Sequence, residues 1–261
     1  QLYSRTLVSV ILFISNTKLG QENNYFDPIN ELKPLTHTWS LAVEEQFYIL
    51  FPVLLIALWK YQRSRIIHIL IALSLLSLIG AEIGSVIKPG ENFYFTLTRS
   101  WELLIGAISA LILDRVSPNR YLPILGFIFI TVAIFFYDST TPTPSIFMLL
   151  PTMGAVFVIL FSRADDRVTR LLAHKVPVFL GRISYSAYLW HYPLFSYYRM
   201  IFGVHVLLSE AVILIFFTFV LAHLTWLYIE QPFRAGELTI VPNQRSIFVL
   251  SGAVSLSVSY T

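Results

Sequence analysis

The sequence contains no cysteine and few charged residues. Without cysteine, its 261 residues can form neither a disulfide nor a thiolate metal site, and thiol catalysis is excluded. Charged side chains make up 13% of the chain, well below the roughly one quarter usual in soluble domains, whereas 56% of the residues are apolar. The net charge of only +3 does not indicate a nucleic-acid partner. This composition predicts a chain whose surroundings are a lipid bilayer.

Several other signatures are missing. The apolar runs show no alternation with period two, so helices are favoured over a transmembrane barrel. The sequence has no Gly-rich phosphate loop, no His-Glu-x-x-His helix and no Gly-x-Ser-x-Gly elbow, and it shows no internal repeat. We therefore expect no bound metal and no permanently bound cofactor.

Long apolar segments dominate the remaining sequence and predict an all-α, polytopic transmembrane bundle. About nine segments can be marked, the first and last being partial: 2–15, 40–59, 66–87, 98–113, 121–137, 145–161, 184–202, 210–229 and 246–261. Because the chain begins and stops within apolar runs, we expect both ends to be cuts through a longer protein.

Basic residues predict the orientation of these segments. With nine alternating segments, 13 of the 18 Lys and Arg residues fall on one side, which is therefore expected to be cytoplasmic. The longest loop on that side, 162–182, predicts an interfacial amphipathic helix, since Val168, Leu171, Leu172 and Val176 have helical spacing. The stretch 35–48 is then expected at the outer face, where the second segment enters the membrane.

A pair of adjacent carboxylates, Glu44 and Glu45, stands close to the start of that second segment. One interpretation is structural, with Ser40 as the N-cap of a helix whose first turn carries acidic residues. The other is functional, because a partly buried glutamate can act as a base or orient a histidine. His37 and Trp39 precede the pair and could contact a substrate.

The fourth segment begins with Arg99, Trp101 and Glu102. Arg99 and Glu102 are three residues apart and can share a helix face. They could form an interfacial ion pair beside a tryptophan anchor. Alternatively, Arg99 could contact a sugar or a carboxylate while Glu102 holds it in position.

The seventh segment carries Trp190, His191 and Pro193, and Arg182 lies directly before it. His191 follows Arg182 by nine residues, or about 13 Å along a helix, which predicts a position deep in the bilayer beside a proline kink. Ionisable residues at such depth are candidates for function. A hydrogen bond to a neighbouring helix is the alternative.

The eighth segment ends with His223, Glu230, Pro232 and Arg234. The simplest interpretation is an interfacial Glu230–Arg234 pair at a helix that terminates at Pro232. A second interpretation makes Arg182 and Arg234, which lie on the same side, part of a cytoplasmic approach for an anionic donor.

Together these stretches resemble the signatures of the acyltransferase 3 family, bacterial membrane proteins that O-acylate cell-envelope glycans. The resemblance rests on order and spacing over essentially the whole chain, and on five stretches: YFDP (25–28), HTWSLAVEEQFYILFP (37–52), TRSWELLIGAISAL (98–111), GRISYSAYLWHYPLF (181–195) and IEQPFR (229–234). It implies a ten-helix core, of which this chain would supply the third helix onwards.

The resemblance also implies a reaction, in which an acyl group passes from cytoplasmic acyl-CoA to a sugar hydroxyl outside. In the family a base histidine lies in the first helix after an arginine, and a basic segment follows the second helix. This sequence contains neither the histidine nor the basic segment. We therefore expect the family's activity of a longer parent protein more than of these 261 residues alone. The last segment resembles an additional helix that precedes an SGNH-type domain in one branch of the family.

We accordingly predict a bacterial inner-membrane, multi-pass O-acyltransferase that uses acyl-CoA, such as acetyl-CoA, and acts on lipopolysaccharide O-antigen or peptidoglycan. Residues 1–245 would form the acyltransferase domain without its first two helices, and 246–261 the start of the additional helix. Glu44, Glu45 and His191 are the catalytic candidates. The substrate-binding candidates are His37, Trp39, Arg99, Trp101, Glu102, Trp190, Arg182 and Arg234. The alternatives are a membrane transporter, a non-catalytic membrane scaffold or an inactive fragment, and the oligomeric state is left open.

Overall fold

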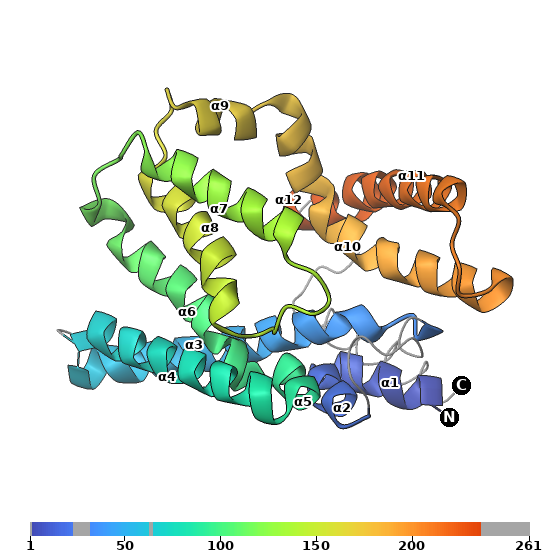
Figure 1. The fold of residues 1–261 in the computed structure, drawn as a ribbon, viewed down its shortest axis with the longest axis horizontal. Coiled ribbons are helices and arrows are strands. Elements are labelled where there is room, and N and C mark those ends of the chain that lie inside the picture. Colours follow the sequence, from blue (N-terminus) through green and yellow to red (C-terminus); the bar gives the residue numbers. More distant parts are fainter. Residues whose placement is uncertain (1, 23–31, 63–64, 236–261) are drawn as a thin grey trace. The chain divides into compact units, whose positions relative to one another are not determined.

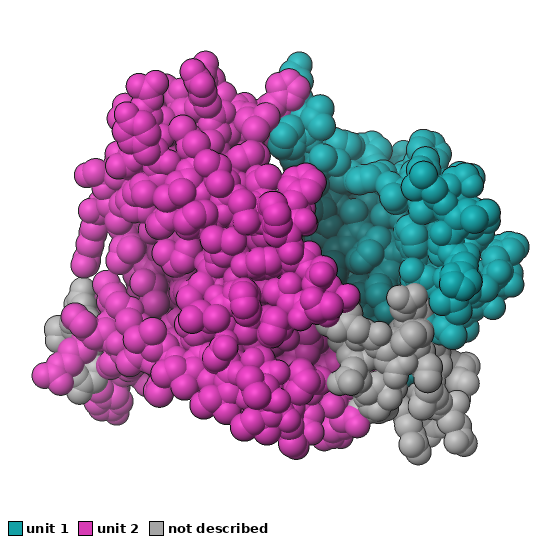
Figure 2. Space-filling model, in the orientation of Figure 1, with its two compact units in different colours: residues 1–15, 27–38, 175–261 teal, residues 16–26, 39–174 magenta. Residues whose placement is uncertain are grey.

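The computed structural model describes residues 2–22, 32–62 and 65–235, and every regular element in these ranges is a helix (Figure 1). The chain forms two compact units. Unit 1 comprises residues 1–15, 27–38 and 175–261, and unit 2 comprises residues 16–26 and 39–174. Figure 2 shows the described residues of unit 1 in teal and those of unit 2 in magenta. The all-α prediction is confirmed for the described part of the chain.

Unit 2 contains the central helices of the sequence. Its elements are α2 (Ser15–Glu22, of which Ser15 belongs to unit 1), α3 (Trp39–Gln62), α4 (Ile66–Ile87), α5 (Pro89–Tyr94), α6 (Thr96–Ile112), η4 (Leu113–Arg115), α7 (Leu122–Phe136), η5 (Ile146–Met148), α8 (Leu149–Phe161) and α9 (Arg167–Leu172). Unit 1 contains α1 (Leu2–Ile11), η2 (Thr36–Thr38), α10 (Lys175–Phe202), α11 (Leu208–Thr225), the π-helix η6 (Trp226–Glu230) and α12 (Gln231–Ala235).

Within the described part of the chain, four helical stretches are long and apolar enough to cross a membrane: Thr36–Tyr61, Ile66–Ile87, Thr96–Arg115 and Leu208–Arg234. Two shorter apolar helices are Leu122–Phe136 and Ile146–Phe161. Large apolar side chains such as Ile56, 70% exposed, and Phe135, 78% exposed, cover their outer surfaces, as expected of helices that face lipid.

The apolar segments predicted the positions of the described helices to within a few residues in most cases. The segment 66–87 coincides with α4, and each of the first eight segments overlaps a described helix. The ninth, 246–261, lies outside the described residues, as does the YFDP stretch at 25–28. The division into domains at residue 245 therefore stays a prediction.

The start of α3 differs from the prediction. Ser40 is not an N-cap, because the helix already begins at Trp39 and is preceded directly by the 3-10 turn η2. The first turn of α3 contains no acidic residue, so Glu44 and Glu45 lie in the second turn. The favourable interaction with the helix dipole, which decays within the first turn, therefore does not explain this pair.

The loop 162–182 does not form the single amphipathic helix that its spacing predicted. The structure has a short helix, α9, and then a separate helix that begins at Lys175, so that Val176 belongs to α10. Pro177 does not prevent this early start, because it occupies the first turn, where a backbone N–H has no helical acceptor. The segment predicted at 184–202 is consequently a helix of 28 residues.

Within unit 2, two glycines face each other where α7 packs against α8. A Cβ added to Gly126 would lie 2.5 Å from the carbonyl oxygen of Gly154, and one added to Gly154 would lie 2.7 Å from that of Gly126. Small residues let helix backbones approach in this way in membrane proteins. Side by side in Figure 1, α7 and α8 form one helical pair of the unit.

Within unit 1, α10 packs against α11, and the helix that follows α11 does not terminate at Pro232. The prediction was wrong because a π turn, in which the Gln231 N–H bonds to the Trp226 carbonyl, ends directly before the proline. Pro232 therefore lies in the first turn of α12, where no N–H is required.

Candidate functional site

Unit 1 brings two of the predicted residues, His37 and His191, close together. Their ring centroids are 5.6 Å apart, in an edge-to-face arrangement. The His37 ring stacks on Tyr192 at 5.1 Å and meets the edge of Tyr188, also at 5.1 Å. The contact places His191 of α10 beside the turn η2 of the same unit.

The His191 ring is oriented by its own helix. Its Nδ1 lies 2.7 Å from the carbonyl oxygen of Tyr188. A carbonyl can only accept, so Nδ1 carries the hydrogen and, in the neutral ring, Nε2 keeps a lone pair. This tautomer is the one that a proton acceptor requires.

His191 also lines a pocket of about 430 Å³ between α10 and α11. The pocket wall is mostly apolar, with hydroxyl groups at a few places; it consists of Leu180, Ser184, Ala187, Tyr188, His191, Phe195, Ile215, Thr218 and Phe219. A mainly apolar cavity with few polar groups is the usual form of a small-molecule site.

Three further predicted residues of unit 1 lie elsewhere on its helices. Trp190 is part-exposed, and its Nε1 donates to Thr225 Oγ1 at 2.9 Å. Arg234 forms the predicted ion pair with Glu230, at 2.8 Å, and Glu230 also accepts a hydrogen bond from Ser186. Arg182 is exposed on α10.

Unit 2 fixes Arg99 between aromatic rings. Its guanidinium lies 4.7 Å from the ring centroid of Trp39 and 4.6 Å from that of Phe93. Its Nε donates to the Phe93 carbonyl at 2.6 Å, and Nη1 lies 3.7 Å from Glu102 Oε2. The predicted Arg99–Glu102 pair is therefore present, but the aromatic stacking was not predicted.

The other predicted residues of unit 2 differ in accessibility. Trp101 is completely buried, and its Nε1 finds no hydrogen-bond partner among the described residues. Glu44 is exposed on α3, whereas Glu45 is half-buried. Their proposed roles in chemistry stay predictions.

A polar network that the sequence did not suggest joins α2, α3 and α6 in unit 2. Gln46 Nε2 donates to Asn16 Oδ1 at 2.9 Å, and Asn16 Nδ2 donates to Thr96 Oγ1 at 3.0 Å and to the Tyr94 carbonyl at 3.1 Å. Thr96 in turn donates to Gln46 Oε1 and closes the ring. The signal that could have found it is the pair of amides, Asn16 and Gln46, next to apolar runs.

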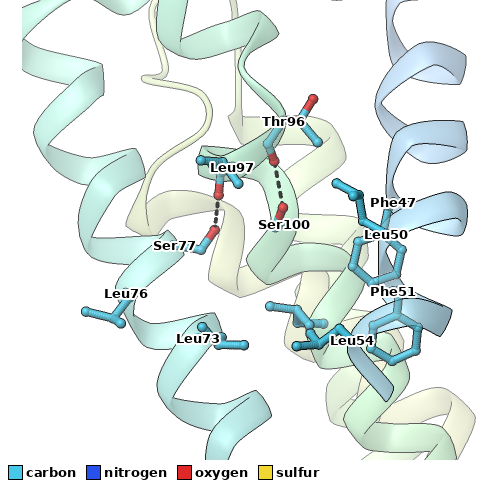
Figure 3. A pocket seen from close by; sticks show the side chains of 11 residues that line it. Phe47, Leu50, Phe51, Leu54, Leu73, Leu76, Ser77, Thr96, Leu97 and Ser100 are labelled. Atoms are coloured by element: carbon cyan, nitrogen blue, oxygen red, sulfur yellow. Dashed lines mark hydrogen bonds between the residues drawn. The ribbon is translucent and has the colours of Figure 1, made fainter. Parts of the chain in front are cut away.

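An apolar pocket of about 380 Å³ lies among α3, α4 and α6, next to this network (Figure 3). It is lined by Phe47, Leu50, Phe51, Leu54, Leu73, Leu76, Ser77, Thr96, Leu97, Ser100 and Leu104. Ser77 donates to the Leu97 carbonyl and Ser100 to the Thr96 carbonyl, as the dashed lines show. With these hydroxyls engaged by backbone, the cavity suits an apolar group.

Comparison with protein families identifies the family of this chain. A family model described as an acyltransferase domain matches residues 3–227. The chain belongs to this acyltransferase 3 family. Together with the four membrane-length helices, this membership makes it a multi-pass membrane protein.

Two curated relatives in the family illustrate the similarity. The chain is 30% identical to "Putative peptidoglycan O-acetyltransferase YrhL" of Bacillus subtilis over 249 residues, covering 87% of the chain and 39% of the relative. It is 29% identical to "Peptidoglycan O-acetyltransferase OatA" of Listeria monocytogenes over 246 residues, covering 87% and 40%. The chain thus spans about two fifths of the length of these relatives. No solved structure matches it.

Proposed function

We propose that this chain is the membrane part of an O-acyltransferase that moves an acyl group, acetyl in the first instance, onto a hydroxyl of a cell-envelope glycan. The observation that carries the proposal is the acyltransferase family match over residues 3–227. Both relatives described above are named as peptidoglycan O-acetyltransferases, which favours peptidoglycan over lipopolysaccharide as the acceptor. The membrane would be the bacterial inner membrane and the donor cytoplasmic acyl-CoA.

One group in each unit supports this proposal by its chemical type. A hydroxyl that attacks a thioester requires a proton acceptor within hydrogen-bond reach, and unit 1 offers His191 in the required tautomer. The oxyanion formed at the acyl carbon requires a fixed positive charge or hydrogen-bond donor. In unit 2, Arg99 is a fixed cation, with Trp39 and Phe93 against its guanidinium.

The remaining predicted residues have supporting roles in this proposal. Glu44 or Glu45 would orient or tune the base. His37, Trp39, Trp101 and Trp190 would contact the sugar or the thioester arm. Glu102 would hold Arg99, and the exposed Arg182 and Arg234 would attract the anionic donor on the cytoplasmic side.

Release of acetate from cell walls tests the proposal. The complete reading frame that encodes this chain is expressed in a host that lacks peptidoglycan O-acetylation, and the walls are treated with mild alkali. We expect alkali-released acetate with the wild-type protein, and loss of most of it with Glu44→Gln or Glu45→Gln at equal amounts of folded protein. Acetate equal to that of the empty host would overturn the function, and normal acetylation in both variants would remove the glutamates from the site.

A further inference from the structure

The apolar pocket among α3, α4 and α6 is not used by the acyl transfer proposed above. It has a volume of about 380 Å³, and all its lining residues belong to unit 2. Eight of the eleven are leucine or phenylalanine, and the other three are Ser77, Thr96 and Ser100. An empty space of this size deprives its walls of packing contacts, so an occupant would stabilise them.

The polar groups in the pocket wall are already bonded within the protein. The hydroxyls of Ser77 and Ser100 donate to backbone carbonyls, as Figure 3 shows. The hydroxyl of Thr96 donates to Oε1 of Gln46. None of the lining residues is charged. The wall therefore presents apolar surface to a ligand and favours a hydrocarbon group over a sugar or a phosphate.

The two ends of the pocket differ in polarity. At one end lies Leu104, which is 5% exposed and forms a buried core with Ile66 and Leu70. At the other end lies Thr96, eight residues earlier on α6 or about 12 Å along the helix, which belongs to the polar network described above. Thr96 also begins a membrane-length stretch, so the polar end of the pocket lies near a membrane interface.

The pocket opens onto the surface that faces lipid. Leu50, Leu76 and Leu97 line it and are exposed on α3, α4 and α6, which are all membrane-length helices. The pocket is therefore continuous with the interface between this membrane protein and the bilayer, and hydrocarbon chains of lipids are its immediate neighbours.

We propose that this pocket binds one acyl chain of a membrane phospholipid, with the end of the chain at Leu104 and the glycerol end near Thr96. This orientation matches the apolar and polar ends of the pocket to those of a lipid. Because no wall residue is charged, the pocket recognises the chain and not a particular headgroup, and the bilayer phospholipids are the source. The bound chain fills the space between α3 and α4 and so helps to position α3, which carries Glu44 and Glu45.

Photo-crosslinking tests where the chain lies. Membranes that contain the protein, expressed from the complete reading frame, are loaded with a phosphatidylethanolamine that carries a diazirine at the end of one acyl chain. The protein is purified in mild detergent, illuminated, digested and analysed by mass spectrometry. We expect crosslinks at Leu54, Leu73 and Leu104, and few at Phe135, an exposed residue of α7 whose lipid neighbours are removed by the detergent. Crosslinks no more frequent in the pocket than at Phe135 would overturn the proposal.

A variant that fills the pocket provides the second test. Ser100→Phe places a ring in the space of the chain and should lose most of the pocket crosslinks. Thr131→Phe is the matched control, because Thr131 on α7 and Ser100 on α6 each donate to the carbonyl four residues earlier, at 2.8 Å. The control should keep the crosslinks. Leu73→Phe fills the pocket from α4 should Ser100→Phe not fold. A folded filling variant with wild-type crosslinks would contradict the assignment.

Native mass spectrometry of the wild-type protein identifies the occupant. We expect the mass of a phospholipid to stay bound, and to be lost in Ser100→Phe. Phosphatidylethanolamine added to delipidated protein should raise the unfolding midpoint of the wild type more than that of Ser100→Phe, because a ligand stabilises the state that binds it. A bound polyprenyl phosphate, a free fatty acid or detergent alone would overturn the phospholipid assignment. None of these measurements depends on acetyl transfer, so their outcome is separate from that of the proposed function.

Discussion

Arg99 stacks its guanidinium on the indole of Trp39, with 4.7 Å between the guanidinium carbon and the ring centroid. The Arg99 side chain is only 14% exposed, and it is held by Phe93 as well as by Glu102. Trp39 is the first residue of α3, and Arg99 lies in the first turn of α6. The stack therefore ties the starts of two membrane-length helices together and fixes a positive charge there.

Replacing Arg99 by lysine tests the importance of this stack. Lysine keeps the charge but loses the planar group and the Nε–H that bonds to Phe93, so we expect a loss of about 1–2 kcal/mol in stability. Thermal unfolding in detergent micelles measures it. Arg115→Lys, at an exposed site, is the matched control and should unfold like the wild type. Equal midpoints for Arg99→Lys and the wild type would show that the stack contributes nothing.

The hydrogen-bonded ring of Asn16, Gln46 and Thr96 leads to a second prediction. Gln46→Leu should destabilise unit 2 by about 1–2 kcal/mol, because it removes the donor to Asn16 Oδ1 and the acceptor of the Thr96 hydroxyl. Asn16→Leu should cost a similar amount. In a double-mutant cycle the two losses should not add, since each change breaks the same network. Additive losses would mean that the two amides act independently. Gln21→Leu, at an exposed position of α2, serves as the control.

Two glycines lead to a third prediction, in which replacement by alanine lowers the stability at one site and raises it at the other. Gly126→Ala should destabilise the α7–α8 pair by about 2 kcal/mol or more, because the added methyl would meet the backbone oxygen of Gly154 at 2.5 Å. Gly106 lies inside α6, and an added Cβ there meets no atom within 4 Å. Gly106→Ala should therefore stabilise the protein by about 0.5–1 kcal/mol through helix propensity. An unfolding midpoint of Gly126→Ala equal to or above that of the wild type would contradict the close approach of α7 and α8.

The helices of this protein could be predicted from sequence because membrane-length apolar runs leave the backbone few alternatives. The segment 66–87, apolar almost throughout, was placed to the residue. The predicted helix ends were less accurate, because side-chain type determines the exact end residue of a helix only weakly. Ser40 has the residue type of an N-cap, but the turn η2 starts the helix earlier, and Pro232 follows a π turn that no pattern indicates.

The candidate site was only partly predictable, for a different reason. Polar residues near apolar runs identified His37, Arg99 and His191, and sequence spacing gave the Arg99–Glu102 pair. Their partners come from packing between distant segments, as with Tyr188 and the carbonyl of His37. Helical periodicity describes one helix at a time, so it does not predict contacts between segments that are far apart in the sequence.

The most direct test of the account is transfer of a labelled acyl group. Protein purified from the complete reading frame is incubated with acetyl-CoA labelled in the acetyl group and with soluble peptidoglycan fragments, and the fragments are analysed by mass spectrometry. We expect labelled acetyl esters on sugar hydroxyls, removed by mild alkali, in amounts that grow with time and with protein. Fragments that stay unlabelled, while the protein is folded and the acetyl-CoA intact, would contradict it.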